Sequence, residues 1–475
     1  MYRQLARLVL YSSLTKGTIL ADVASIYRDH ARALAATPRG ERLAPDVRSD
    51  LLARANACAK RLLDLATTYG FDRDLWGDYL AFCLLTNENS FSLTAERRGA
   101  TEGGSVNDLA CADMEVFLAL EHWDFTLLEE SLGTKVFSAL RSWRSIPKPD
   151  ANYFAGVSRR VRALSDALAR CQMADEAFCL VAAAYAQDGV GTFGLNAAFR
   201  IRTVDKDLAP DAYTPQTYTV GSLEFVPVNN ARGPRLADLV GYELQKERLV
   251  ANTEAFLAGR PANNVLLYGD AGTGKSTSVK ALLSAYEDQG LRMIEIYKYQ
   301  FRDLSRVIEA VKHRNYRFVI FIDDLSFEEN EVEYKFLKAV IEGGVEQRPE
   351  NVLIYATSNR RHLIREVWSD RNDIEHDGDV HRSDTVEEKL SLAARFGVSI
   401  NYGSPDPQLY HQIVLELAAR ELPEGLYTDE ALCKLADRWE IRHGGYSGRT
   451  AQQFIDHLAG EALAGETPAQ PGERG

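Results

Sequence analysis

One octapeptide, GDAGTGKS at residues 269–276, restricts the possible folds of this chain more than any other feature. It follows the apolar run VLLY at 265–268 and matches the pattern G-x-x-x-x-G-K-[ST]. Glycines at this spacing let successive backbone N–H groups turn inward, and the helix that follows directs its positive dipole end to the same place. The octapeptide therefore predicts a phosphate-binding loop between a strand and a helix of an α/β sheet.

The side chains of this loop predict Mg²⁺-ATP as the ligand. We expect Lys275 to bind the β- and γ-phosphates, where a charge-assisted hydrogen bond contributes roughly 1.5–3 kcal/mol, and the Ser276 hydroxyl to be a Mg²⁺ ligand. The alternative is a glycine-rich turn without a ligand. The residues expected to surround the phosphates are Gly269, Asp270, Ala271, Gly272, Thr273, Gly274, Lys275, Ser276 and Thr277.

A second motif, FVIFIDD at 318–324, is an apolar strand that ends in two carboxylates. This is a Walker B pattern, and the preceding phosphate loop makes it more than a strand that happens to end in two acids. Asp323 is expected to hold Mg²⁺, and Asp324 to activate the attacking water as the catalytic base. Glu328, four residues further on, is the rival for the role of base.

The hydrophobic pattern divides the chain into segments. Residues 1–205 show helical stripes and predict an all-α amino-terminal domain, and the proline-rich residues 206–235 predict a linker or strand arm. In residues 236–402, β-branched runs at 264–268, 293–297, 318–322, 352–357 and 398–402 alternate with helical segments, as a parallel sheet covered by helices requires. We expect a helical lid over 403–461 and a disordered tail over 462–475.

Charge and cysteine usage restrict the partners and the compartment. Lys and Arg total 55 against 68 Asp and Glu, and the net charge of −13 argues against non-specific nucleic-acid binding. We therefore expect an unknown macromolecular partner that is a protein rather than a nucleic acid. The six cysteines form no CxxC pair, and no signal peptide or membrane anchor is evident, so we expect a cytoplasmic protein that does not interact with a membrane.

Four further features resemble AAA+ ATPases. Asn359, after the apolar strand NVLIYATS, resembles the first sensor, and Arg395 in LSLAARFG lies where the arginine finger reaches a neighbouring subunit's nucleotide. Arg449 begins a lid helix where the second sensor arginine lies, and Gly241 and Tyr242 resemble the adenine-pocket segment. These similarities imply an AAA+ P-loop NTPase sheet, a homo-oligomer, and catalytic roles for the three polar residues. The competing interpretations are a helix-capping asparagine and solvated arginines.

A closer resemblance covers roughly residues 236–460. The segments LVGYELQKERLVANTEAFLAGRPANNVLLYGDAGTGKS, FIDDLSFE, YKFLKAVIEGG, NVLIYATSNRRHL and EKLSLAARFG are similar to a family of uncharacterised bacterial ATP-binding proteins catalogued as a domain of unknown function. The resemblance implies an AAA+ ATPase with a helical amino-terminal extension and supplies no physiological substrate. AAA+ proteins usually have a glutamate at the position of Asp324. An aspartate at this position is similar to the pattern of replication initiators and helicase loaders.

Three functions are compatible with these patterns. The first is an oligomeric AAA+ ATPase that couples Mg²⁺-ATP hydrolysis to remodelling of a macromolecular partner, and the second is an ATP-gated adaptor, similar to a helicase loader, with slow turnover. The third is a small-molecule P-loop kinase, against which the helical lid speaks. Because residues 1–205 carry no catalytic constellation, we assign them to partner recognition, with a purely structural docking role as the alternative.

Overall fold

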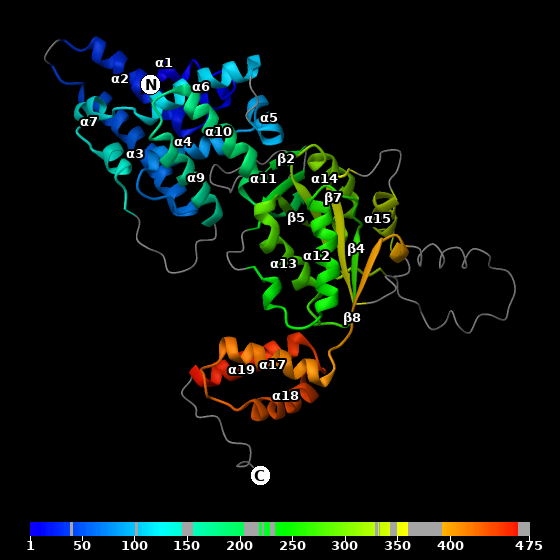
Figure 1. Cartoon of the computed structure of the whole chain (residues 1–475). Coiled ribbons are helices and arrows are strands. Elements are labelled where there is room, and N and C mark those ends of the chain that lie inside the picture. Colours follow the sequence, from blue (N-terminus) through cyan, green and yellow to red (C-terminus); the bar gives the residue numbers. More distant parts are fainter. Residues whose placement is uncertain are drawn as a thin grey trace. The chain divides into compact units, whose positions relative to one another are not determined.

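The computed structural model describes residues 1–38, 41–99, 103–144, 155–203, 218–220, 223–228, 233–327, 331, 333–342, 349–359 and 392–463. These residues form two compact units, Met1–Arg232 and Gly233–Gly475 (Figure 1). Each unit has its own hydrophobic core, and each is described by itself below.

The amino-terminal unit is built mainly from helices around α4. All residues of α4 from Leu75 to Leu85 are buried, which is typical of a helix surrounded by others. Its first turn is fixed by the Asp74 side chain, which accepts from the N–H groups of Trp76 and Gly77. The helices are α1 (Tyr2–Leu5), α2 (Ile19–Ala36), α3 (Pro45–Tyr69), α4 (Leu75–Thr86), α5 (Ser90–Arg98), α6 (Ser105–Glu121), α7 (Thr126–Leu132), α8 (Val136–Arg141), α9 (Ala155–Leu168), α10 (Ala174–Asp188) and α11 (Gly191–Leu195), with a 3₁₀ turn η1 (Ser12–Thr15).

The same unit ends in three antiparallel strands. Strand β3 (Leu223–Pro227) pairs with both β1 (Ala198–Thr203) and β2 (Tyr218–Val220). The helical part therefore ends at Leu195, before the predicted limit of residue 205, and the unit is not purely α-helical. In β1, buried Phe199 and Ile201 alternate with exposed arginines, a period of two that a short segment after a long helical region conceals.

The carboxyl-terminal unit contains a parallel sheet of five strands in the order β5-β6-β7-β4-β8. Each of the five predicted β-branched runs contributes one strand, and the middle strands β6 and β7 are buried almost throughout. Burial on both faces explains why these strands have continuous apolar sequences. The strands are β4 (Val265–Gly269), β5 (Leu291–Glu295), β6 (Arg317–Ile322), β7 (Val352–Ser358) and β8 (Val398–Tyr402).

Helices pack on this sheet and connect its strands. Residues Leu249 and Phe256 of α12 and Val279 and Leu282 of α13 share one apolar cluster with side chains from all five strands, so both helices cover the same face (Figure 1). The helices and 3₁₀ turns of this part are η2 (Leu236–Asp238), α12 (Glu243–Leu257), α13 (Lys275–Tyr286), η3 (Glu287–Gln289), η4 (Lys298–Asp303), α14 (Leu304–Val311) and α15 (Glu333–Glu342).

The strand order brings the predicted motifs to one edge of the sheet. Strand β4 lies between β7 and β8, although it precedes both in sequence, so the chain reverses its direction of travel across the sheet there. In open α/β sheets, ligands bind at such a switch point, outside the carboxyl ends of the strands. The phosphate loop follows β4, the two aspartates follow β6, and Asn359 follows β7, all at this edge.

Three helices follow β8 and form the predicted lid: α17 (Pro407–Glu421), α18 (Asp429–His443) and α19 (Gly448–Leu463). They share their own apolar cluster, which includes Tyr410, Leu432 and Phe454. Asp406 and Thr428 cap the first two helices through their side chains. Within the residues that the structure describes, no helix is both long and apolar enough to cross a membrane.

Candidate nucleotide site

The phosphate loop has a backbone that only glycine adopts without strain. Gly269, Gly272 and Gly274 have φ values of 137°, 78° and 89°. A Cβ atom on Gly269 would lie 2.0 Å from the carbonyl oxygen of Tyr402, and one on Gly272 would lie 3.0 Å from the Arg449 Cβ atom. Among the described residues, no backbone carbonyl accepts from the N–H groups of Gly272 or Lys275. This loop at the start of α13 is a concave set of donors suited to an anion.

Lys275 is held inside the loop that it would share with a phosphate. Its ammonium donates to the carbonyl oxygens of Gly269 at 2.9 Å and Asp270 at 2.5 Å, and only 6% of the residue is exposed. Burial lowers the pKa of Lys275, and the nearby carboxylates of Asp270, Asp324 and Asp323 oppose this shift. Since the charge is desolvated and its hydrogen bonds to described residues go to neutral carbonyls, a polyphosphate would be a stronger partner.

Asp270 fixes the loop to the chain after β8. Its carboxylate accepts from the N–H group of Ser404 at 2.8 Å and from the Ser404 hydroxyl at 2.7 Å, and these bonds hold its pKa below the usual range. Its own N–H group donates to the carbonyl oxygen of Tyr402 at 3.0 Å. Asp270 therefore stabilises the shape of the loop by binding to the chain after β8. The other predicted residues of this segment include Ala271, Thr273 and Thr277.

The predicted metal ligands meet at the carboxyl end of β6. The Ser276 hydroxyl donates to Asp323 Oδ1 at 2.5 Å, and the Thr357 hydroxyl donates to the same oxygen at 2.6 Å. The Lys280 ammonium lies 3.8 Å from Asp323 Oδ2 and 4.0 Å from a Glu295 carboxylate oxygen. A hydroxyl and a carboxylate in contact beside a phosphate loop are the hard oxygen donors that Mg²⁺ prefers, so this donor set fits that ion.

Asp324 and Asn359 form the second pair at this edge. The Asn359 amide donates to Asp324 Oδ1 at 3.0 Å, so the predicted sensor and the predicted base touch. Asp324 has φ of 54°, a left-handed conformation that aspartate tolerates better than most residues. Its N–H group donates to the Thr357 hydroxyl at 2.9 Å. The rival base, Glu328, lies outside the described residues.

The lid touches the phosphate loop through the start of α19. The Arg449 N–H group donates to the carbonyl oxygen of Gly272 at 3.2 Å, and the Arg449 charge is one of the influences that lower the pKa of Lys275. Two cationic residues therefore lie at the phosphate loop, Lys275 at the start of α13 and Arg449 at the start of α19.

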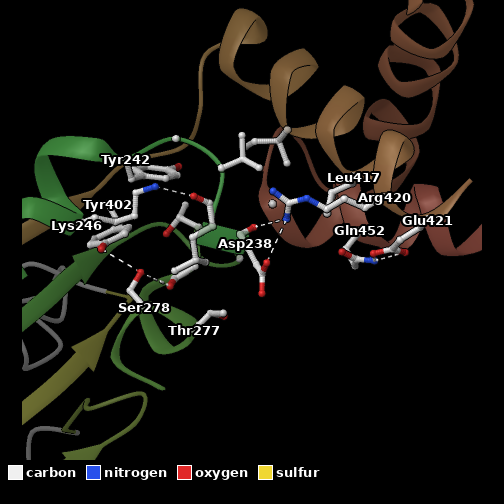
Figure 2. Close-up of a pocket in the computed structure, with 18 residues that line it drawn as sticks. Asp238, Tyr242, Lys246, Thr277, Ser278, Tyr402, Leu417, Arg420, Glu421 and Gln452 are labelled. Atoms are coloured by element: carbon white, nitrogen blue, oxygen red, sulfur yellow. Dashed lines mark hydrogen bonds and ion pairs between the residues drawn. The ribbon is translucent and has the colours of Figure 1, made fainter. Parts of the chain in front are cut away.

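A cavity of about 400 Å³ lies beside the loop, between the 236–246 segment and the lid (Figure 2). Its walls include Gly241 and Tyr242, and the Tyr242 ring stacks on Tyr402 with centroids 5.1 Å apart. Gly241 has φ of 77°, and a Cβ atom there would lie 2.5 Å from a Leu409 methyl group. On the lid side, Arg420 donates to the carbonyl oxygen of Asp238 at 3.0 Å. Thr273 and Gly274 also line the cavity, which joins it to the phosphate loop.

Arg395 has a partner in its own chain. It lies just before β8 and forms an ion pair with Glu342, the last residue of α15. The predicted role of Arg395 concerns a second subunit, so its contribution stays a prediction.

Sequence reasoning missed several residues that the fold brings to this site. Thr357 was detectable, because it lies two residues before Asn359 in a strand and must therefore point to the same side of the sheet. Ser404, Tyr402 and Lys280 gave no such signal, because their contacts depend on where β8 and α13 lie relative to the phosphate loop.

The strand order, the phosphate loop, the paired aspartates and the helical lid define an AAA+ P-loop fold, which confirms the predicted fold class. The profile of the family described as "Protein of unknown function (DUF815)" matches residues 212–462. The chain belongs to this family, and the family resemblance inferred from the sequence is confirmed.

Other comparisons add only distant likenesses. No curated protein matches the chain. RuvB of Thermotoga maritima, a Holliday junction branch migration motor, is 17% identical with a TM-score of 0.36, over 50% of this chain and 67% of RuvB. The FIGL-1 AAA domain in complex with ADP is 18% identical with a TM-score of 0.33, over 49% of this chain and 74% of that domain. The fold assignment accordingly rests on the topology and motifs of the chain itself.

Proposed function

We propose that this protein is an AAA+ ATPase that binds Mg²⁺-ATP and couples its hydrolysis to the remodelling of a macromolecular partner. One observation carries the proposal: Lys275 and Arg449 meet at one glycine-rich loop, Asp323 and Asp324 end the nearby strand β6, and a cavity of about 400 Å³ adjoins the loop. The two cations suit the phosphates of a nucleotide, the two carboxylates suit its metal ion, and the adjoining pocket suits its nucleobase.

Each residue then has a chemical task. The loop amides with Lys275 would bind the phosphates, Ser276 and Asp323 would hold Mg²⁺, and Gly241 with Tyr242 would line the base pocket. The Mg²⁺ ion that Ser276 and Asp323 would hold would supply positive charge beside the phosphates.

Hydrolysis needs a second group of residues. Asp324 would accept the proton of the attacking water, and Asn359, which contacts it, would orient that water. Arg449 would bind the γ-phosphate, so that the lid closes when this phosphate is present. Arg395 would complete the site of a neighbouring copy in a homo-oligomer, after exchanging its ion pair with Glu342 for the phosphate charge.

A specific observation favours a second candidate, an ATP-gated adaptor with slow turnover. The proposed base is an aspartate in a left-handed backbone conformation whose Oδ1 is already hydrogen-bonded to Asn359. A short, restrained acid reaches an attacking water less readily than a glutamate. ATP turnover that stays slow alone and rises with the partner distinguishes this candidate.

Charge and cysteine usage bear on the partner and the place of action. The net charge of −13 supports a protein partner over nucleic acid and gives no attraction to anionic membranes. The amino-terminal unit, which lies outside most of the family match, would recognise the partner. We place the protein in the cytoplasm because the chain contains free cysteines without a disulfide among the described residues.

The experiment that tests nucleotide binding compares two lysine variants. Lys275→Ala removes the ammonium from the loop, and a fluorescent ATP analogue should bind about 10- to 100-fold more weakly, since a hydrogen bond to a charged group contributes roughly 1.5–3 kcal/mol. Lys434→Ala is the matched control, because Lys434 is exposed on α18 and pairs only at the surface with Glu430. A folded Lys275→Ala protein that binds the analogue as tightly as the control would contradict the proposal.

A further inference from the structure

Thr357, near the end of β7, contacts both aspartates of the proposed site, through the carboxylate of Asp323 and the backbone N–H group of Asp324. Only 1% of the residue is exposed. A threonine hydroxyl has one hydrogen to donate and two lone pairs to accept. Here the hydrogen goes to Asp323 Oδ1 at 2.6 Å, and a lone pair accepts from the Asp324 N–H group at 2.9 Å.

The first contact sets the orientation of Asp323. Its Oδ1 accepts from two hydroxyls, those of Thr357 and Ser276, and this fixes the plane of the carboxylate. The other oxygen, Oδ2, faces the Lys280 ammonium at 3.8 Å. Without the Thr357 hydroxyl, the carboxylate would have one hydrogen bond fewer, and we expect the attraction to Lys280 to turn it away from Ser276.

The second contact restrains the backbone of Asp324. A left-handed conformation at a residue other than glycine costs on the order of 1–3 kcal/mol and persists only where the surroundings impose it. Thr357 imposes it twice, since its hydroxyl accepts from the Asp324 N–H group and its carbonyl oxygen accepts from the Leu325 N–H group at 2.6 Å. The turn that directs the Asp324 side chain to Asn359 is therefore built on one residue of the neighbouring strand.

We propose that Thr357 is a positioning residue that sets the geometry of both the metal-binding carboxylate and the proposed base. The inference rests on the proposed function. It separates two properties of the site, because among the described residues the Thr357 hydroxyl is hydrogen-bonded to Asp323 and Asp324 and not to the phosphate loop or Lys275. Loss of the hydroxyl should weaken Mg²⁺ binding and hydrolysis while leaving metal-free nucleotide binding intact.

The test compares three variants of the full chain. Thr357→Val keeps the shape and removes the hydroxyl, Thr357→Ser keeps the hydroxyl, and Thr253→Val is the matched control. Thr253 is also a buried threonine, but its hydroxyl bonds to the Leu249 carbonyl oxygen and the Tyr355 hydroxyl, and not to Asp323 or Asp324. Binding of a fluorescent ATP analogue is measured first with a chelator and then during a Mg²⁺ titration, and ATP turnover is measured separately.

For Thr357→Val we expect unchanged nucleotide affinity in the chelator, at least a tenfold higher Mg²⁺ concentration at half-effect, and turnover reduced about 10²-fold by the misplaced base. Thr357→Ser should recover both properties, and Thr253→Val should resemble the parent. If Thr357→Val does not fold, Thr357→Ala is measured against the same expectations.

Four results overturn the assignment. One is a Mg²⁺ dependence and turnover of Thr357→Val equal to those of the parent. Another is the same loss in Thr357→Ser, or a loss of metal-free binding in Thr357→Val, because either would mean that Thr357 only supports the strand. A parent protein that binds no nucleotide even with Mg²⁺ overturns the proposed function itself and this assignment with it.

Discussion

The two units use the carboxylates of aspartate in opposite ways. In the amino-terminal unit, Asp113 is fully buried and accepts from the N–H groups of Val9, Leu10 and Tyr11 at 2.8–3.2 Å. In the carboxyl-terminal unit, Asp323 is only partly buried and meets hydroxyls, while Asp324 is exposed and meets one side-chain amide.

The difference lies in how completely the protein satisfies each charge. Three backbone amides surround Asp113, so no capacity remains for a ligand and the carboxylate serves to attach the amino-terminal segment to α6. The carboxylates at the sheet edge keep solvent access and lie beside the phosphate loop, where no carbonyl of the described backbone accepts from the N–H groups of Gly272 or Lys275. A carboxylate whose hydrogen-bonding capacity is filled by backbone N–H groups, such as that of Asp113, has a structural role. A carboxylate that keeps solvent access, such as those of Asp323 and Asp324, can bind a metal ion or accept a proton.

The largest effect is expected at Arg395, because its proposed role lies at the nucleotide site of a second subunit. Arg395→Ala should reduce ATP hydrolysis by about 10³–10⁵, the range for an arginine finger. Mixing it with Lys275→Ala should recover part of the turnover, because each chain supplies what the other lacks. Mixed assemblies that form but never hydrolyse ATP would show that Arg395 does not act in trans.

The next largest effect is expected at Asp324 and tests its assignment as the catalytic base. Asp324→Asn removes the proton acceptor and keeps the shape, so hydrolysis should fall by about 10²–10⁴ while Mg²⁺-ATP still binds. Single-turnover measurements on Asp324→Asn and Glu328→Gln compare the two candidate bases. If the first hydrolyses bound ATP at close to the parent rate and the second does not, Glu328 is the base.

Replacement of the buried Asp113 should affect stability and leave nucleotide binding and hydrolysis unchanged. Asp113→Ala leaves three N–H groups without their acceptor, and the local free energy of unfolding should fall by about 3 kcal/mol or more. Hydrogen exchange at residues 9–11 measures this loss. Glu115→Ala is the control on the same helix, since Glu115 forms an exposed pair with Arg7 of the kind that contributes little. Equal protection in both variants would contradict the structural role of Asp113.

Glu121 tests a buried carboxylate that the amino-terminal unit does not satisfy. Among the described residues, neither of its carboxylate oxygens has a hydrogen-bond partner, although Arg141 lies 3.8 Å from one of them. Burial raises the pKa of Glu121 from 4.5 to about 7, with Asp74 adding to the shift and Arg141 opposing it. Because the folded state keeps a proton that the unfolded state has lost, stability falls as the pH rises from about 4.5 to 7, and the penalty is complete above 7.

Glu121→Gln should therefore stabilise the amino-terminal unit by about 1–3 kcal/mol at pH 8 and by much less at pH 4.5. Urea unfolding at the two pH values measures the difference, with Glu130→Gln, at an exposed position of α7, as the control. The same stability change at both pH values would mean that packing, not ionisation, is responsible.

The smallest effect is expected from separating the units. A fragment of residues 233–475 contains every residue proposed to contact the nucleotide and one complete core, so its ATP affinity should equal that of the full chain. Equilibrium binding of the fluorescent analogue to both proteins is the measurement. A folded fragment that has lost ATP binding would place part of the site in the amino-terminal unit.

The sequence alone determined those features whose cause is local. The five strands of the parallel sheet are encoded by apolar runs, because strands buried on both faces need continuous apolar residues. The limits of the strands depend on more than local sequence. Strand β5 begins at Leu291 rather than 293, since Arg292 becomes buried over the Tyr316 ring at 4.4 Å, a contact that no local pattern predicts.

The phosphate loop and the paired aspartates were also predictable, because their chemistry depends on spacing within a few residues. Tertiary structure alone decided which residues share an oxygen or a cavity. Thr357 and Ser276 meet on Asp323, and Ser404 holds Asp270, only because β4 lies between β7 and β8 and so brings distant segments to one edge. Hydrogen bonds act over about 3 Å, and only the folded chain sets which groups come that close.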